Sequence, residues 1–436
     1  MSPVGSPAET PPDALNCAAG DSTRGYPGAS STSSATVTTS TTGTPMDATR
    51  GFIVGTRGSA LALAQTQLVV DALTPHLSQP LDVQIITTHG DTTRAHLVDL
   101  AQQGHTGVFA NAIRRALLEG QIDLAVHSCK DLPADPCPGL EILAMPPRGA
   151  TADCLCTTAG WTLETLPEGA RVGTGSPRRA AQLLRVRPDL SIVPIRGNIE
   201  RRLRYLEEPV LNTPIGSGSG SGDGSCSDAP LDAVVLAEAG LQRLAARDTE
   251  ADTVLRYISQ RLPFLPSPAQ GALALEVRMD TTPAPLRQAL LAINHQPTLL
   301  AAIAERALLR TLHAGRELPI GAEATAQVHP QTRGVELTLR AEILSPDGRE
   351  RNAVEHTVTV PQLSWAEESA EAAAAEIAAA EVAGAESAAG LLAAAPLDID
   401  PGLVDPAYYA EAHEAQLAAA YQLGQMVARR LQANAR

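Results

Sequence analysis

The sequence is poor in several features that would place a chain in a familiar functional class. Aromatic residues make up only 3% of the 436 residues, and the net charge is −15. An acidic chain of this kind is a poor generic binder of nucleic acid. No apolar run is long enough to span a membrane, and no basic start followed by an apolar segment marks a secretory signal. We therefore expect a cytoplasmic protein with no nucleic-acid or membrane partner.

Cysteine is also scarce, and none of it lies in the last part of the chain. The cysteines lack the spacing of metal ligands, and the tripeptide Cys154-Leu155-Cys156 is a weak signal. We therefore predict reduced thiols and no metal site. The six cysteines are Cys17, Cys129, Cys137, Cys154, Cys156 and Cys226.

What the sequence does contain indicates several domains. The hydrophobic fraction of 44% is enough for real cores, and the length suggests two or three domains. The strand and helix patterns predict two α/β domains and a small C-terminal α+β domain. A strand at 272–277 is expected to return to the first sheet, which leaves a two-domain cleft, a common place for ligands. The predicted parts are a disordered tail at 1–50, α/β domain 1 at 51–147 and 272–285, α/β domain 2 at 148–271 with a flexible insert at 209–230, and the α+β domain at 286–436 with an Ala/Glu-rich insert at 364–396.

Residues 171–203 are the most informative stretch. They predict a strand, a tight turn and a helix capped by Ser176, then a second strand at 191–195, a turn and another helix. Arginines and helix-start N–H groups therefore gather at the carboxyl ends of neighbouring strands, where open α/β sheets bind ligands. Because Arg can hold carboxylates in a bidentate fork, we expect a polyanion site, with a solvated helix face as the alternative. The arginines are Arg178, Arg179, Arg196, Arg201, Arg202 and Arg204.

A second candidate position follows the strand predicted at 122–127. That strand leads into His127–Pro133, which contains Lys130 and Asp131. A carboxylate surrounded by cations would stay ionised and could stabilise positive charge that develops during a reaction. We therefore predict a catalytic role for Asp131, with a structural ion pair to Lys130 as the alternative. His127 could act as a base, but a hydrogen-bonded packing role is favoured for it.

A set of motifs runs in order from residue 51 to about 325. It consists of GTRGSALALAQ, THGD, GVFANAIRRALLEGQIDLAVHSCKDLP, VGTGSPRRAAQLLRVRPDL, IRGNIERRL, LAEAGLQRL, PSPAQGALALE and ERALLRTLHAG. Each motif alone is weak, but the ordered set is highly specific and resembles the porphobilinogen deaminase (hydroxymethylbilane synthase) family. The resemblance implies two periplasmic-binding-protein-like α/β domains with an interdomain cleft and a small C-terminal α+β domain, in a monomer.

The resemblance also implies a reaction. The family is a transferase that joins four porphobilinogens head to tail into hydroxymethylbilane, with loss of ammonia at each step, in heme and porphyrin biosynthesis. Each substrate pyrrole carries an acetate and a propionate, and the chain grows on a dipyrromethane primer. Asp131, aided by Lys130, would be the catalytic carboxylate that steadies the pyrrole N–H and a cationic azafulvene. The positions matching the family's substrate- and cofactor-binding residues are Arg57, Ser59, Ser128, Thr174, Ser176, Arg178, Arg179, Arg196, Arg202, Arg243, Phe109 and Gln270.

One position departs from the family's pattern. The family attaches its primer to a cysteine just after the helix that resembles ERALLRTL, whereas Arg316 stands at that place here. An arginine cannot form the thioether, so covalent attachment of dipyrromethane is in doubt. The loop expected at 92–106 also carries Gln102 and Thr106 where some members have lysines.

Three functions are therefore compatible with the sequence. The leading one is an active deaminase whose primer is held non-covalently or attached elsewhere. The second is a catalytically impaired paralogue that binds porphobilinogen or linear pyrroles, although retention of Asp131 argues against a pure binder. The third is an anion- or solute-binding module that uses the same two-domain cleft, and the missing secretory signal argues against an exported receptor.

Overall fold

The structure is a computed structural model. It describes residues 50–87, 110–208, 229–247, 252–314, 318–328, 334–360 and 406–434. The predicted tail apart from Arg50, the first insert apart from 229–230, and the whole Ala/Glu-rich insert lie outside the described residues. So do the loop expected at 92–106, Phe109 and Arg316.

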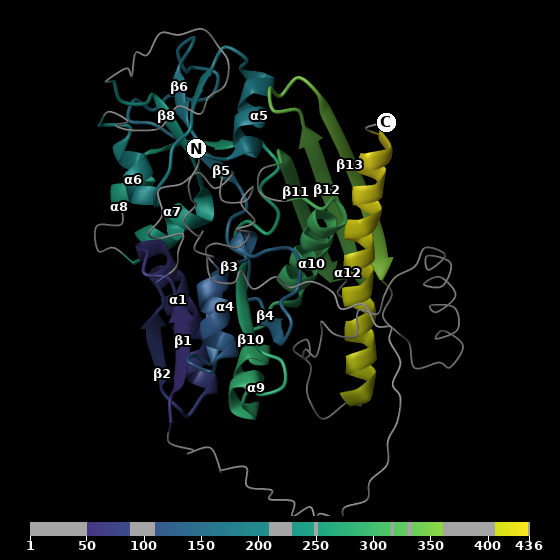
Figure 1. Ribbon diagram of the computed structural model, residues 1–436. Coiled ribbons are helices and arrows are strands. Elements are labelled where there is room, and N and C mark those ends of the chain that lie inside the picture. Colours follow the sequence, from purple (N-terminus) through teal and green to yellow (C-terminus); the bar gives the residue numbers. More distant parts are fainter. Residues whose placement is uncertain are drawn as a thin grey trace, which may run out of the picture. The chain divides into compact units, whose positions relative to one another are not determined.

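Within the described part of the chain, the strands form three sheets, and the first has five strands (Figure 1). They are β1 (Phe52–Thr56), β2 (Leu81–Ile85), β3 (Leu124–Ser128), β4 (Leu140–Ala144) and β10 (Leu273–Arg278). Their order is β2-β1-β3-β10-β4. β1 pairs in parallel with β2 and β3, whereas β10 runs antiparallel to both β3 and β4. The strand predicted at 272–277 is β10, and it returns to this sheet as expected.

Helices lie on both faces of the first sheet, and this explains why β3 begins with the apolar run Leu124-Ala125-Val126. A central strand covered on both faces reads as a continuous apolar run rather than an alternating one. Val126 packs in one cluster with Val69, while Ala125 packs in another with Ile113. The helical elements of this part are α1 (Ala60–Leu73), η1 (Thr74–His76), α4 (Asn111–Leu118), η2 (Cys129–Asp131) and α9 (Ala284–Ala292).

The second sheet also has five strands, in the order β7-β6-β8-β5-β9. They are β5 (Asp153–Cys156), β6 (Arg171–Gly173), β7 (Ser191–Val193), β8 (Ala233–Ala237) and β9 (Ile258–Leu262). The helices are α5 (Pro177–Val186), α6 (Ile199–Arg204), α7 (Glu238–Ala245) and α8 (Asp252–Leu255). The strand predicted at 191–195 ends earlier, at Val193, because Pro194 has no N–H to continue the ladder. In the preceding turn, a Cβ on Gly175 would lie 2.6 Å from the carbonyl oxygen of Ile195, so glycine is needed there.

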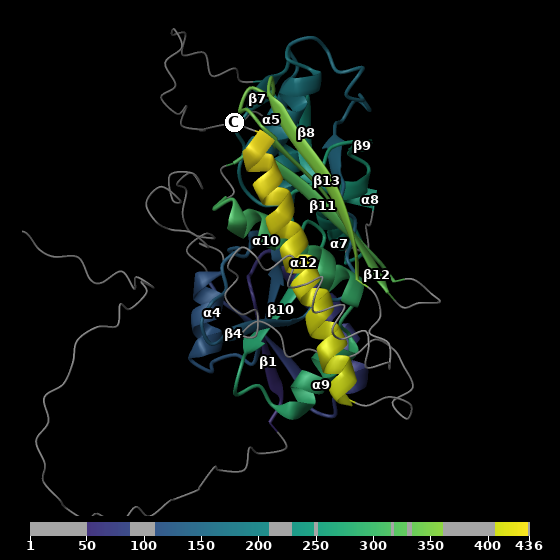
Figure 2. The same ribbon diagram turned by 90° about the vertical axis from the view of Figure 1, so that its right-hand side faces the viewer.

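The third sheet is antiparallel, in the order β11-β12-β13. Its strands are β11 (Ile320–Val328), β12 (Val335–Leu344) and β13 (Arg351–Val360), and α10 (Gln296–Thr311) and α12 (Pro406–Asn434) pack together beside it (Figure 2). Leu308, Leu339 and Leu423 belong to the apolar cluster that these elements share. Two α/β sheets and a small α+β unit confirm the predicted fold class, while the exact domain boundaries stay a prediction. None of the described helices is both long and apolar enough to cross a bilayer.

Candidate active site

A hollow opens where β3 ends and the turn η2 begins. Its lining includes the side chains of the two sequence candidates that follow β1, Arg57 and Ser59, together with Ser128 and Asp131. Arg57 lies between the end of β1 and the start of α1, and the Ser59 hydroxyl caps α1 by accepting the N–H of Ala62 at 3.3 Å. The parallel pairing of β1 with β3 places both strand ends at one edge of the sheet. The structure thus brings Arg57, Ser59, Ser128 and Asp131 to one hollow, and their roles toward a ligand stay a prediction.

Gln65 is a further lining residue that the sequence argument missed. It lies one turn beyond the cap of α1, and its Oε1 accepts the hydroxyl of Ser128 at 3.0 Å. The residue is buried. A sequence signal was available, because a glutamine on the buried side of a helix must find polar partners when the helix packs on a sheet. Gln65 orients Ser128 toward one wall of the hollow.

Lys130 and Asp131 lie in the same turn but differ in their surroundings. The Lys130 ammonium donates to Oε1 of Gln270 at 3.0 Å, whereas Asp131 lines the hollow. Both side chains are half-buried. A half-buried carboxylate next to cationic and hydroxyl groups can accept an N–H from a ligand and favour a nearby positive charge.

His127 is buried against an acid on the neighbouring strand. Its Nε2 lies 3.2 Å from Oε2 of Glu276, and Arg114 donates to the same carboxylate from Nε at 3.0 Å and Nη2 at 2.7 Å. Burial alone would raise the pKa of Glu276, but His127 and Arg114 together lower it to about 2. This is the packing role that the sequence favoured for His127, now with its partner identified.

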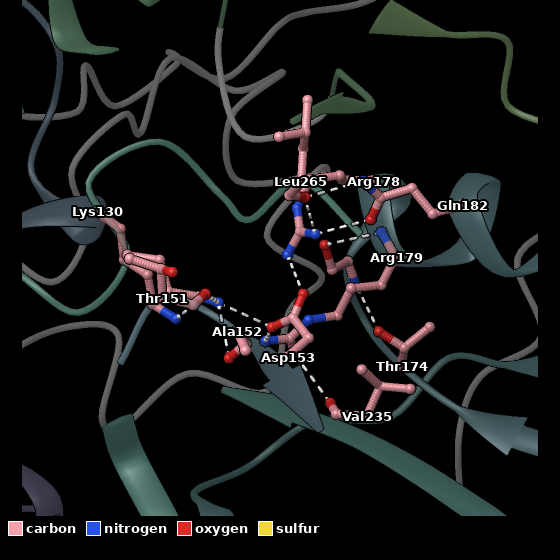
Figure 3. Close-up of polar contacts among 12 residues, drawn as sticks. Lys130, Thr151, Ala152, Asp153, Thr174, Arg178, Arg179, Gln182, Val235 and Leu265 are labelled. Carbon is pink, nitrogen blue, oxygen red and sulfur yellow. Dashed lines mark hydrogen bonds and ion pairs between the residues drawn. The ribbon is translucent and has the colours of Figure 1, made fainter. Parts of the chain in front are cut away.

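The two arginines that open α5 are buried rather than solvated. Arg178 donates from Nη2 to Oδ2 of Asp153 at 2.7 Å, and Arg179 donates from Nη2 to Oδ1 at 2.6 Å (Figure 3). Asp153 is only 1% exposed. Burial works to raise its pKa, but the two guanidiniums and an amide donor from Gln270 hold that pKa well below the usual range. The solvated-face alternative is therefore wrong for this pair, and both guanidiniums are directed at an internal acid that the sequence did not reveal.

The other candidates of the second sheet gather around the ends of β6 and β7. The Ser176 hydroxyl caps α5 by accepting the N–H of Arg179 at 3.4 Å, and Thr174 Oγ1 accepts the N–H of Ser176 at 3.2 Å. Arg196 is half-buried after β7, and Arg202 in α6 donates from Nε to the carbonyl of Gly197 at 2.9 Å. These groups supply cations and hydroxyls at one edge of the sheet.

Arg243 lies in a different place. From α7 it donates to the carbonyl of Gly271 at 2.6 Å and lines a second hollow with Leu68, Gly149 and Gln242, apart from the residues that line the first. Burial lowers the pKa of Arg243 to about 10. Its predicted role in holding pyrrole carboxylates stays a prediction.

The thiols of the described residues do not offer a nucleophile in these places. Cys129, Cys154 and Cys156 are fully buried. Burial raises the pKa of Cys129, and burial together with nearby carboxylates raises that of Cys154 to about 12. A buried thiol with a raised pKa is an inert packing group.

Cations and hydroxyls thus lie at the strand ends of two mixed α/β sheets, and Asp131 lies among those of the first sheet. Two family models match the chain: "Porphobilinogen deaminase, dipyromethane cofactor binding domain" over residues 52–284 and "Porphobilinogen deaminase, C-terminal domain" over 299–380. The porphobilinogen deaminase of Thermobifida fusca is 42% identical over 73% of this chain and 89% of its own length. The porphobilinogen deaminase of Cutibacterium acnes is 46% identical over 74% of this chain and 92% of its own length. The chain belongs to the porphobilinogen deaminase family.

Solved structures with similar arrangements are more distant. One is a Candida albicans gene product whose title describes the generic periplasmic binding protein fold, with 9% identity, a TM-score of 0.30, and coverage of 61% of this chain and 72% of that one. Another is an ABC transporter from Parabacteroides distasonis, with 17% identity, a TM-score of 0.30, and coverage of 61% and 77%.

Proposed function

We propose that the chain is a hydroxymethylbilane synthase, a transferase that polymerises porphobilinogen into the linear tetrapyrrole hydroxymethylbilane with release of ammonia. The observation that carries this proposal is the position of Asp131. It lines a hollow together with Arg57, Ser59 and Ser128, inside the stretch that the family model matches. An impaired paralogue or a solute receptor is less favoured, because a pure binder of anions has no use for a carboxylate in its site.

The residues of the hollow suit each part of porphobilinogen. Arg57 and the hydroxyl of Ser59 are donors for the acetate and propionate groups, while the hydroxyl of Ser128 already donates to Gln65. Asp131 would accept the pyrrole N–H. When ammonia leaves, the pyrrole becomes a cationic azafulvene, and the carboxylate of Asp131 stabilises that charge as it forms. Lys130, which directly precedes Asp131 and is held by Gln270, adds a cation to the same turn.

A dipyrromethane primer fits the charges of this site but not the expected covalent link. When bound, the primer supplies the first two rings of the growing chain. Arg57, Arg196 and Arg202 are half-buried cations that would hold its carboxylates. No cysteine follows Cys226, and Arg316 stands at the expected attachment point. We therefore propose that the primer is held without a thioether, by ionic contacts alone.

The proposed cellular location and oligomeric state follow from the family and from the composition. We propose a cytoplasmic monomer that acts on porphobilinogen and linear pyrroles. Separation of a cell lysate into membrane and supernatant fractions, with sedimentation of the purified chain, tests both points. A sedimentation coefficient that corresponds to a dimer would contradict the second.

The activity itself is tested by porphobilinogen turnover, followed through ammonia release and tetrapyrrole colour. We expect the wild-type protein to turn over and Asp131→Asn to lose kcat by about 10²–10³-fold, the effect typical of a lost electrostatic stabiliser. The matched control is Asp135→Asn, an exposed acid four residues further on that pairs with Arg310. Binding of porphobilinogen without product would show that the chain is the impaired paralogue.

The primer proposal is tested by intact mass. We expect the wild-type protein to have the mass of its polypeptide after denaturation, with the primer released into solution. Arg316→Cys should instead retain a dipyrromethane through denaturation, because it restores a thiol at the expected place. A primer that stays on the denatured wild-type chain would overturn the proposal.

A further inference from the structure

Lys130 is the only lysine among the 436 residues, so 32 of the 33 Lys and Arg residues are arginine. Arginine and lysine differ in shape: guanidinium is a planar fork, whereas ammonium is a compact charge on a flexible stem. A chain that uses arginine at every other basic position keeps an ammonium directly before Asp131.

Gln270 provides the contact that fixes Lys130. Its Oε1 accepts from the Lys130 ammonium at 3.0 Å, while its Nε2 donates to the carbonyl of Thr151 at 2.7 Å and to Oδ1 of Asp153 at 2.9 Å. Gln270 is 0% exposed. Since both ends of its amide are used inside the protein, Gln270 is not available to contact a pyrrole. Figure 3 shows Lys130 on one side of this network and Asp153 with its two arginines on the other.

The backbone around Gln270 holds its side chain in one orientation. Ala269 has a φ of 60° and Gly271 a φ of 85°, and both lie in the left-handed region. A Cβ on Gly271 would lie 2.4 Å from the carbonyl oxygen of Gly149, so the two segments that connect the α/β sheets touch backbone to backbone. The N–H of Ala269 is held by the buried carboxylate of Glu305. Gln270 therefore lies on a backbone segment that is held from both sides.

We propose that Gln270 is the positioning residue of this site: it fixes the Lys130 ammonium in the turn that also carries Asp131, and ties it to Asp153, Arg178 and Arg179 across the connection between the two sheets. This inference rests on the proposed function for the importance of Lys130 in turnover. It replaces direct ligand binding as the role of Gln270. Through Gln270, the charged groups of both sheets share one continuous hydrogen-bonded path.

The single lysine makes a direct test possible. Reductive methylation with ¹³C-formaldehyde labels Lys130 and otherwise only the α-amino group, which titrates separately at lower pH. Gln270→Glu places a carboxylate against Lys130 and should raise the titration midpoint of its ¹³C signal. Gln270→Met removes the acceptor and should lower it. General damage to the fold would shift both variants in the same direction, so opposite shifts identify a direct contact.

Gln182 supplies the matched control. It is another buried glutamine of the same network, bonded to Arg178 and Glu342 but not to Lys130 in the contacts described above. Gln182→Met and Gln182→Glu should leave the Lys130 midpoint in place. Equal midpoints in wild type and both Gln270 variants, or equal shifts from the Gln182 variants, would overturn the proposal.

Turnover gives a second readout that a structural role would not produce. Gln270→Met should lower kcat/KM by roughly tenfold, the usual scale for one lost hydrogen bond to a charged group. When Lys130 is already replaced by Met, Gln270→Met should lower kcat/KM by less than about twofold, because the Gln270–Lys130 hydrogen bond is already absent. Equal losses in both backgrounds would contradict the proposal. If the wild-type protein does not turn over at all, the proposed function fails, while the Lys130 titration still decides the positioning role.

Discussion

The two α/β sheets bury one acid each in the same place in their strand order, but they surround it differently. β5 and β10 are the antiparallel strands at the fourth position of their sheets. Asp153 on β5 faces two arginines, whereas Glu276 on β10 faces one arginine and His127. A guanidinium stays charged at any working pH. The second sheet therefore pairs its acid with two fixed cations, whereas the first pairs its acid with one fixed cation and a histidine ring.

The comparison also separates structural charge from charge available for chemistry. The sequence predicted a binding role for Arg178 and Arg179 and a catalytic role for Asp131, in each case because the residue follows a strand. In the structure both arginines donate to the buried carboxylate of Asp153, whereas Asp131 lines a hollow. A cation with a buried partner organises its neighbours, and a carboxylate at the wall of a hollow can meet a substrate.

The largest effect is expected at Asp153. Asp153→Asn leaves two buried guanidiniums without an anion, and removal of one partner from a buried ionic group typically costs about 3–5 kcal/mol of unfolding free energy. Urea denaturation measures this loss. The control is Asp189→Asn, which removes the exposed partner of Arg187 and should change stability much less. Equal losses in the two variants would show that burial of Asp153 does not matter.

A smaller and pH-dependent effect is expected at Glu276. Its folded-state pKa of about 2 lies below the ordinary value of 4.5, so its contribution is present above pH 4.5 and is lost as the pH falls toward 2. The shift corresponds to roughly 3 kcal/mol. The stability gap between wild type and Glu276→Gln, measured by urea denaturation, should therefore close between pH 4.5 and 2. A gap that stays constant over this range would contradict the pairing.

The smallest effect is expected at the two helix caps, where the sheets should behave alike. Ser59 caps α1 and Ser176 caps α5 through the same hydroxyl-to-N–H contact. Ser59→Ala and Ser176→Ala should each lower the unfolding free energy by about 1 kcal/mol. Thermal and urea unfolding of the two variants provide the measurement. A loss several times larger in one variant would mean that its serine does more than cap a helix.

Local features of the fold were predictable because their causes lie within a few residues. Ser176 before Pro177 predicts the start of α5, and the structure confirms the cap. The turn Ser345-Pro346-Asp347-Gly348 predicts the β12–β13 connection, and Gly348 adopts a φ of 73° there. The return of the strand at 272–277 was also predictable, because two α/β units followed by a late strand favour a crossing back.

The charged partners were not predictable, because they depend on contacts far apart in sequence. Arg178 is 25 residues from Asp153, and Arg114 is 162 residues from Glu276. Strand order decides these pairs, and no pattern near Arg114 indicates it. For the same reason the sequence identified Asp131 and Arg57 as candidates but missed Gln65, Asp153 and the inward-facing amide of Gln270.

The antiparallel position of β10 has a consequence for synthesis of the chain. The first sheet needs residues from Phe52 to Arg278, and the whole of the second sheet is made in between. After Arg114 is made, the ribosome adds 162 further residues before its partner Glu276 is in the chain. At the usual pace of translation this interval is on the order of ten seconds. A ribosome therefore carries an incomplete first sheet throughout that interval, and the second sheet gains its last strand, β9, only shortly before β10 is made. A chaperone that shields the open edge of β3 would act in that interval.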